Sequence, residues 1–206
     1  TAEFSDRIRR EFAAGDMVRD AGLTTPDGVE RYDDISYGSD PSYHLLDVYR
    51  PVGMKGEKLP VIAIVHGGAW VYGDKDVYQH YGMSLAGRGF AVVNFSYRLA
   101  PEHRFPAQLE DICAAFDWIA SNALQYGLDT GNVFAVGDSA GSQLLGLYTA
   151  LYSNDKYICE LKETYPDACF VSMEGKERRI SLNAVALNCG KYDLSKGNPE
   201  DLDTVT

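Results

Sequence analysis

The stretch VFAVGDSAG at residues 133–141 decides how the rest of this sequence is interpreted. Residues 133–136 form a short apolar run, which is typical of a strand buried on both faces of a sheet. An apolar helical pattern follows from Ala140 to about Tyr152. The Gly-x-Ser-x-Gly segment therefore joins a strand directly to a helix, which is the context in which this motif exposes a serine hydroxyl.

The spacing of the two glycines has a steric reason. A serine at a sharp strand-to-helix turn has a strained backbone, and side chains two residues away on either side would clash. Gly137 and Gly141 remove those side chains. The hydroxyl of Ser139 should then lie exposed at the carboxyl edge of the sheet, near the positive end of the helix. The alternative interpretation is an ordinary glycine-rich turn.

A second small-residue segment, HGGAW at residues 66–70, follows the apolar run at 61–65. Small residues let backbone amides approach a ligand oxygen closely. With the amide of Ala140, this loop would form an oxyanion hole. The alternative is a tight turn in which His66 satisfies the backbone. The strand–helix–strand spacing between the two motifs favours the oxyanion hole.

Strands and helices alternate along the chain, which predicts an α/β fold of three layers with a mainly parallel sheet. Strands are expected at 31–37, 43–50, 61–65, 90–95, 133–136 and 182–189, and the last four should be buried. Helices are expected at 3–14, 76–88, 107–125 and 140–152. The first two strands, separated by residues 38–41, should form an antiparallel pair. The mixed segment at 153–179 is an expected insertion.

The expected domain organisation is one domain over residues 1–206. Residues 1–30 would form a helix and a loop, a candidate cap, and residues 31–206 the core. The helix at 3–14 places Phe4, Ile8 and Phe12 on one apolar stripe. The chain begins with Thr1, so a removed signal peptide stays open as an alternative.

The composition argues against several classes of protein. Nineteen basic and 30 acidic residues give a net charge of −11, so a nucleic-acid partner is not expected. No apolar run is long enough for a membrane span. The four cysteines contain no CxxC pair, so no metal is expected. Cys113 and Cys189 are predicted to be small core residues, and a Cys159–Cys169 disulfide stays open.

Three motifs in order carry a family resemblance: HGGAW (66–70), YRLAPEHRFPA (97–107) and GDSAG (137–141). The chain resembles the α/β-hydrolase fold, and specifically the hormone-sensitive-lipase-like esterases with their acetyl-esterase and feruloyl-esterase-type relatives. The resemblance covers about residues 45–190. It implies a serine esterase that needs no cofactor and acts on short-chain acyl or acetyl esters.

The resemblance also implies roles for single residues. Ser139 would be the nucleophile, and the oxyanion donors would be the amides of Gly68, Ala69 and Ala140. Gly67 would shape the loop, and His66 and Asp138 would support the site. The family usually has glycine where this chain has Ala69; the alanine amide still donates unless the position needs a positive φ.

The segment at 97–107 is structural in the family, so we expect no catalytic role for His103. Its two prolines, Pro101 and Pro106, are candidates for cis peptide bonds.

No general base is identified in this sequence. In this fold the triad order is Ser, acid, His, and all four histidines precede Ser139: His44, His66, His80 and His103. The family has eight strands, whereas six are expected here, so we expect missing C-terminal strands and a histidine beyond residue 206. Asp193 is a candidate acid placed one strand too early. Asp201 and Asp203 are weaker candidates.

Two alternatives to a serine esterase remain open at this stage. One is a non-catalytic protein that binds a small molecule on the same fold. The other is an amide or formamide hydrolase, since acyl transfer uses the same machinery. The expected partner is a small-molecule ester, a homodimer is left open, and a cytoplasmic location is expected.

Overall fold

The computed structural model describes residues 2–170 and 180–194, and among these the strands form one six-stranded sheet. The strands are β1 (Val29–Ser36), β2 (Leu45–Pro51), β3 (Leu59–Val65), β4 (Ala91–Phe95), β5 (Leu128–Asp138) and β6 (Leu182–Asn188). Their order in the sheet is β1-β2-β4-β3-β5-β6. β1 and β2 are antiparallel to each other, β2 is antiparallel to β4, and the remaining pairs are parallel. The predicted mixed sheet is confirmed.

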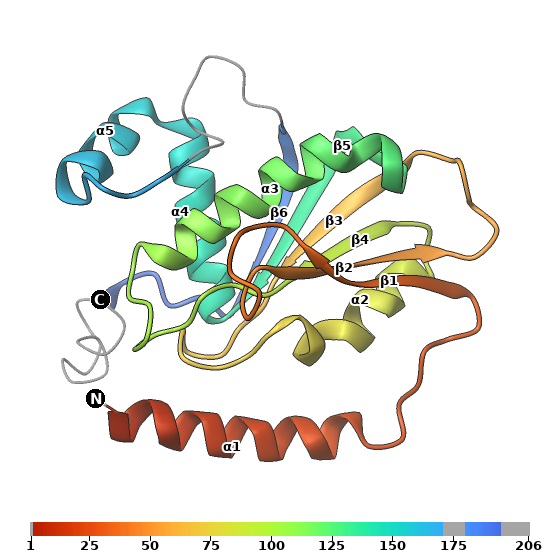
Figure 1. Cartoon of the computed structure of the whole chain (residues 1–206), viewed down its shortest axis with the longest axis horizontal. Coiled ribbons are helices and arrows are strands. Elements are labelled where there is room, and N and C mark those ends of the chain that lie inside the picture. Colours follow the sequence, from red (N-terminus) through yellow and green to blue (C-terminus); the bar gives the residue numbers. More distant parts are fainter. Residues whose placement is uncertain (1, 171–179, 195–206) are drawn as a thin grey trace.

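Helices cover the sheet on two sides (Figure 1). They are α1 (Ala2–Asp20), α2 (Gln79–Ala86), α3 (Ala107–Tyr126), α4 (Ala140–Ser153) and α5 (Asp155–Thr164), with a short 3-10 turn, η1 (Lys75–Tyr78), before α2. α3 and α4 lie on one face and α2 on the other. The segment expected as helix 76–88 thus begins as a 3-10 turn. α5 lies in the region expected as an insertion, of which residues 171–179 are outside the described residues.

The period-two alternation of a strand explains why β3 is apolar throughout. Val61, Ala63 and Val65 face the larger core under α3 and α4. Ile64 faces the smaller core with Met83 of α2. Because both faces are covered, neither face of the strand carries polar residues.

β6 corrects one prediction. It was expected to be buried, but it is an edge strand whose residues are mostly exposed. Its apolar sequence suits burial, yet β5 is its only strand neighbour among the described residues, and α4 packs on one face. Cys189, directly after β6, is exposed rather than in the core. Cys113 is buried as expected, and Cys159 and Cys169 are free thiols.

The N-terminal helix packs onto loops near the sheet edge. Phe4 and Ile8 contact the small cluster of Val71 and Ala100, whereas Phe12 is 41% exposed and meets the ring of Tyr72 edge-on. The expected apolar stripe is therefore only partly buried.

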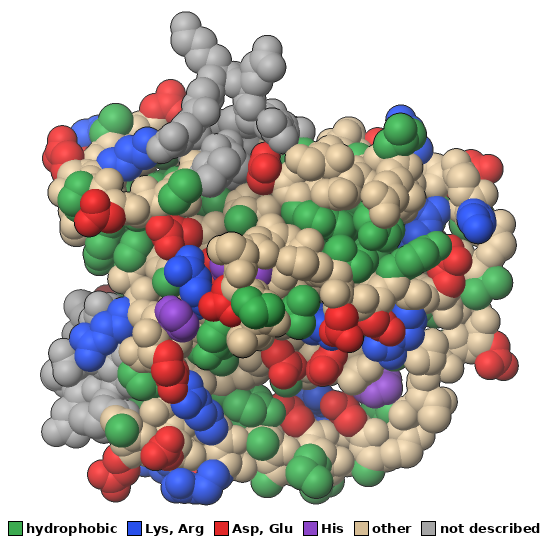
Figure 2. Space-filling view, viewed as in Figure 1, with side chains coloured by type: hydrophobic (Ala, Val, Ile, Leu, Met, Phe, Trp, Pro, Cys, Tyr) green, Lys and Arg blue, Asp and Glu red, His purple; other side chains and the backbone are tan. Residues whose placement is uncertain are grey.

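The distribution of charge on the surface bears on whether the protein could bind nucleic acid. On the face in Figure 2, acidic and basic side chains are interspersed rather than gathered into one basic patch. Among the described residues, no helix is both long and apolar enough to cross a membrane.

Candidate functional site

Two connecting segments meet at the carboxyl edge of the parallel strands. β3 ends at Val65, which pairs with Gly137 near the end of β5. The loop at residues 66–70, here the 66–70 loop, therefore leaves the sheet beside residues 137–141, here the Ser139 turn. The sequence prediction that the two motifs share one sheet edge is confirmed.

The Ser139 turn has the strained geometry that its sequence predicts. Ser139 lies between the end of β5 and the start of α4, with φ 51° and ψ −112°. A non-glycine residue in such a region stores about 1–3 kcal/mol of strain. The Ser139 amide donates to the Asn188 carbonyl at 2.8 Å, and the Ser139 side chain is exposed. Among the described residues no group hydrogen-bonds to the hydroxyl.

The flanking glycines are required by close backbone contacts. A Cβ on Gly137 would lie 2.6 Å from the Gly141 carbonyl oxygen, and a Cβ on Gly141 would lie 2.1 Å from the Val65 carbonyl oxygen. Real Cβ atoms essentially never approach that closely. The first glycine lets α4 start directly above β5, and the second lets α4 rest on the end of β3.

The 66–70 loop turns through three consecutive residues with positive φ. These are Gly68 (φ 128°), Ala69 (φ 53°) and Trp70 (φ 62°). A Cβ on Gly68 would lie 1.9 Å from the Tyr72 carbonyl oxygen, so only glycine fits there. Ala69 does occupy a left-handed conformation, which costs an alanine about 1–2 kcal/mol. Ala69, at the position that is usually glycine in the family, therefore adopts the positive φ at a cost in strain.

Three backbone amides at this edge have no acceptor among the described residues: those of Gly68, Ala69 and Ala140. Ala140 is the first residue of α4, where amides have no partner within the helix. Unpaired amides beside an exposed hydroxyl can hold an oxygen that develops negative charge. The geometry is thus compatible with the oxyanion role expected for these residues.

His66 lies beneath the loop rather than beside the hydroxyl. Its ring is fully buried, stacks on Tyr97 at 4.0 Å, and its Nδ1 lies 2.8 Å from the Gly67 carbonyl oxygen. Burial lowers the pKa of His66 to about 4, so the ring is neutral near pH 7. This matches the turn-supporting interpretation of His66.

Asp138 has a partner that sequence reasoning missed. The Tyr78 hydroxyl donates to Asp138 Oδ2 at 2.5 Å. Burial, and then the bond to Asp138, raise the pKa of Tyr78, so the phenol stays protonated. Tyr78 belongs to no motif, and no pattern in the sequence indicates that its hydroxyl meets Asp138.

A cavity of about 250 Å³ adjoins the site on the α4 side. Trp70 and Gln143 form part of its wall, and the indole Nε1 donates to the Gln143 side-chain oxygen at 3.2 Å. The backbone amide of Gln143 donates to the Ser139 carbonyl. The other lining residues are Phe105, Gln108, Leu147, Tyr157, Tyr165 and Leu194. No motif or periodicity in the sequence indicates this cavity.

Two of the other histidines, His44 and His103, make contacts away from Ser139. His44 Nε2 lies 3.0 Å from Asp111. The ring of His103 meets Tyr43 edge-on, and the His103 carbonyl accepts from Gln108. His103 therefore supports its loop, as expected, and the bonds before Pro101 and Pro106 are both cis.

Asp193, the one candidate acid among the described residues, does not lie at the end of a strand. Asp193 lies five residues beyond the end of β6. Asp201 and Asp203 fall outside the described residues. In the described part of the chain, the site therefore contains a hydroxyl and amides but no base in contact with them.

Comparisons with a family model and with curated proteins point to the same family. The model of the BD-FAE family matches residues 46–204. Esterase LipC of Mycobacterium tuberculosis is 35% identical over 168 residues, 81% of this chain and 38% of LipC. Carboxylesterase NlhH of the same species is 37% identical over 105 residues, 50% of this chain and 33% of NlhH. This chain spans less than two fifths of the length of either relative.

Solved structures agree with the fold. Esterase B from Lactobacillus rhamnosis superposes with a TM-score of 0.75 at 31% identity, over 91% of this chain and 56% of that one. An esterase from the archaeon Pyrobaculum calidifontis gives 0.60 at 34% identity, over 74% of this chain and 48% of that one.

Proposed function

The chain belongs to the BD-FAE family of α/β hydrolases, and from that membership we propose that it hydrolyses carboxylic esters through Ser139. The observation that carries the proposal is the strained, exposed Ser139 beside three amides that lack acceptors. The relatives and structural neighbours are named esterases, which supports ester hydrolysis as the reaction.

The proposed mechanism has two steps. The Ser139 oxygen attacks the ester carbonyl carbon while a base takes its proton, and the carbonyl oxygen becomes an anion. The amides of Gly68, Ala69 and Ala140 would hold that anion, and each donor contributes about 3 kcal/mol to the transition state. The protonated base then gives its proton to the leaving alkoxide, so the intermediate expels the alcohol and leaves an acyl-serine. The same base activates a water that hydrolyses the acyl-serine to the acid and free Ser139.

The base is not among the described contacts of Ser139. His66, the first residue of the 66–70 loop, is buried, and its Nδ1 is hydrogen-bonded to the Gly67 carbonyl. We propose that the base is a histidine supplied by sequence beyond residue 206. Residues 1–206 alone should then show only the roughly 10³–10⁴-fold acceleration over water that remains when triad members are absent.

The cavity favours a small group. Its volume of about 250 Å³ lies below the roughly 300–1,000 Å³ typical of drug-sized ligands. Its walls are mostly apolar and aromatic, with Gln108 and Gln143 as the polar side chains. A short acyl chain or one aromatic ring would fit. We therefore propose a short-chain ester as substrate.

The experiment that tests this function compares esters of different acyl-chain length as substrates of the intact protein. Hydrolysis of p-nitrophenyl acetate, butyrate and decanoate is measured for the wild type and for Ser139→Ala. We expect acetate and butyrate to be cleaved far faster than decanoate, and Ser139→Ala to abolish the activity. Turnover unaffected by Ser139→Ala would contradict the serine mechanism. Ligand binding without turnover would favour a binding protein instead.

A further inference from the structure

We propose that Tyr78 is a positioning residue that fixes the 66–70 loop against the Ser139 turn, and that Lys75 anchors the turn carrying it. The inference rests on the proposed function, because it concerns how the nucleophile and the oxyanion donors are held at a set distance. It adds a residue that lies outside every motif of the sequence.

The contacts of Tyr78 join the two segments directly. Its hydroxyl donates to Asp138 Oδ2 at 2.5 Å, next to Ser139 in the chain. The phenol oxygen also lies close to the Gly67 backbone, whose influence by itself lowers the pKa of Tyr78. A Cβ on Gly67 would lie 3.2 Å from the phenol oxygen and 3.3 Å from Asp138 Oδ2. One hydroxyl therefore touches both segments of the site.

The position of the phenol is fixed by its ring and by its turn. The ring packs against the apolar cluster that contains Ile64 of β3 and Val136 of β5. Tyr78 is also the last residue of η1 and the N-cap of α2, so its backbone is held by both. The hydroxyl thus has little freedom to follow a displaced loop.

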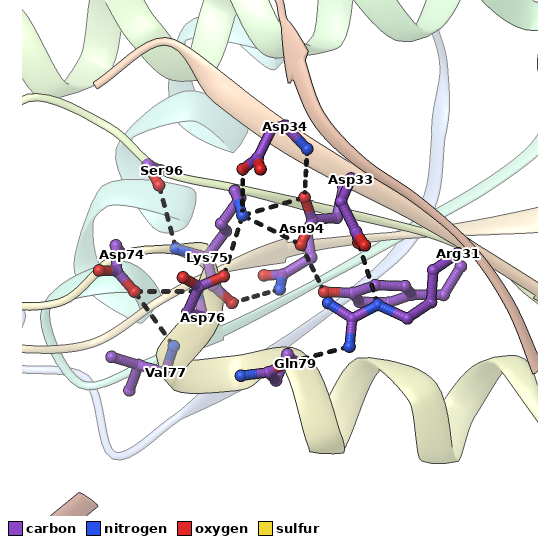
Figure 3. A network of polar contacts seen from close by, with 12 residues as sticks. Arg31, Asp33, Asp34, Asp74, Lys75, Asp76, Val77, Gln79, Asn94 and Ser96 are labelled. Atoms are coloured by element: carbon purple, nitrogen blue, oxygen red, sulfur yellow. Dashed lines mark hydrogen bonds and ion pairs between the residues drawn. The ribbon is translucent and has the colours of Figure 1, made fainter. Parts of the chain in front are cut away.

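The η1 turn is tied to the sheet through the backbone of Lys75. The Lys75 amide donates to the Ser96 hydroxyl at 3.0 Å, and the Lys75 carbonyl accepts from the Asn94 side chain at 2.5 Å. Asp74 caps the turn by accepting from the amides of Asp76 and Val77. Figure 3 shows the bonds from Asn94 of β4 and from Ser96, directly after β4, meeting at Lys75, with the Asp74 bonds inside the turn.

The Lys75 side chain adds a second tie, to β1 and β2. Its ammonium lies 2.8 Å from Asp34, 3.1 Å from Asp47 and 2.9 Å from Asp76 (Figure 3). Asp47 is fully buried. The Asp34 amide, in a left-handed residue where the register of β1 shifts, donates to Asp47 at 2.9 Å. Burial opposes the charge, but these carboxylates raise the pKa of Lys75 overall.

The consequence is a loop held at both ends. The segment that contains the 66–70 loop leaves β3 at Val65 and is tied back to the sheet at Lys75. Tyr78 then links this segment to Asp138. Displacing reacting groups by about 1 Å can cost a factor of about 100 in rate. Removing the Tyr78 hydroxyl should therefore lower kcat and leave KM nearly unchanged, because substrate binding does not use this bond.

The test compares Tyr78→Phe with Tyr72→Phe in the intact protein. Tyr72 also donates to a carboxylate, Asp16 in α1 at 2.7 Å, but does not contact Asp138. With p-nitrophenyl acetate, we expect Tyr78→Phe to lower kcat by about 10- to 100-fold with KM within 2-fold, and Tyr72→Phe to change neither. Combining Tyr78→Phe with Asp138→Ala should be no worse than the poorer single variant, since both remove one bond. Multiplying effects would overturn the inference.

Amide hydrogen exchange provides a readout that needs no activity. Tyr78→Phe should speed exchange in both the 66–70 loop and the Ser139 turn, whereas Tyr72→Phe should leave the Ser139 turn unchanged. Unchanged exchange of that turn in Tyr78→Phe would overturn the inference even if the protein is an active esterase. Faster exchange of both segments in Tyr78→Phe, in a protein whose wild type hydrolyses no ester, would support the inference and contradict only the proposed function.

Discussion

A Cβ on Gly141 would lie 2.1 Å from the carbonyl oxygen of Val65. Backbone therefore rests on backbone where α4, which begins after Ser139, meets the end of β3, which leads into the 66–70 loop. The contact sets how far the hydroxyl lies from the loop amides. It also shows that a residue two positions from the candidate nucleophile acts by having no side chain.

The first prediction concerns two glycines of α4. Gly141→Ala should lower the free energy of unfolding by about 3 kcal/mol or more, because the new methyl group overlaps backbone that cannot move aside. Gly146→Ala should raise it by up to about 1 kcal/mol, since its Cβ would meet nothing closer than 3.5 Å and alanine favours helix. Urea unfolding measures both. Equal effects would mean that the contact with Val65 is not tight.

Ala69 is predicted to be a strained position. Ala69→Gly should raise the free energy of unfolding by about 1 kcal/mol, because glycine adopts φ 53° without steric cost. Ala14→Gly, in the exposed part of α1, should lower it by about 1 kcal/mol. The two substitutions are chemically identical, so opposite signs in thermal or urea unfolding isolate the backbone conformation. A loss of stability in Ala69→Gly would contradict the left-handed assignment.

The Lys75 cluster is predicted to be costly to break. Lys75→Met should lower the free energy of unfolding by about 3–5 kcal/mol, because it leaves buried Asp47 without its cation. Lys156→Met removes an exposed lysine paired with Glu160 at 3.4 Å, and should change stability by less than about 1 kcal/mol. Urea unfolding of both variants at one pH makes the comparison. Similar losses would show that the cluster is no more important than a surface pair.

His66 is predicted to make the fold sensitive to acid. Its pKa of about 4 in the fold lies below the value of about 6.5 in an unfolded chain. The unfolded state therefore binds more protons between these pH values, and stability falls as pH drops through that window. The full loss is about 3 kcal/mol. The fall from pH 7 to 4 should be smaller in His66→Phe than in the wild type, whereas His80→Asn should keep it. Parallel curves for the wild type and His66→Phe would contradict the prediction.

Local patterns predicted much of the fold. Apolar runs located the strands because a strand covered on both faces carries few polar residues, as in β3. The glycine spacing at 137 and 141 located the Ser139 turn, because the steric requirement is local in sequence. The same reasoning located β6 but wrongly predicted that β6 and Cys189 are buried. An apolar segment indicates a tendency to be buried, but exposure depends on what packs against it.

The supporting contacts of the site were not predictable in this way. Tyr78 and Asp138 are 60 residues apart in the chain, and neither residue lies in a pattern that indicates the other. Lys75 similarly gathers Asp34 and Asp47 from two strands. Such bonds depend on tertiary distances, so a single sequence contains no periodic signal for them. The cavity beside Gln143 is missed for the same reason.

The most direct test of the central claim is covalent labelling of the nucleophile. The intact protein is treated with diethyl p-nitrophenyl phosphate, a phosphoryl analogue of an ester, and the adduct is located by peptide mass spectrometry. The account predicts one diethylphosphoryl group on Ser139, loss of esterase activity in step with labelling, and no adduct in Ser139→Ala. Ester hydrolysis that persists in fully labelled protein, or an adduct on another residue that accounts for the lost activity, would contradict it.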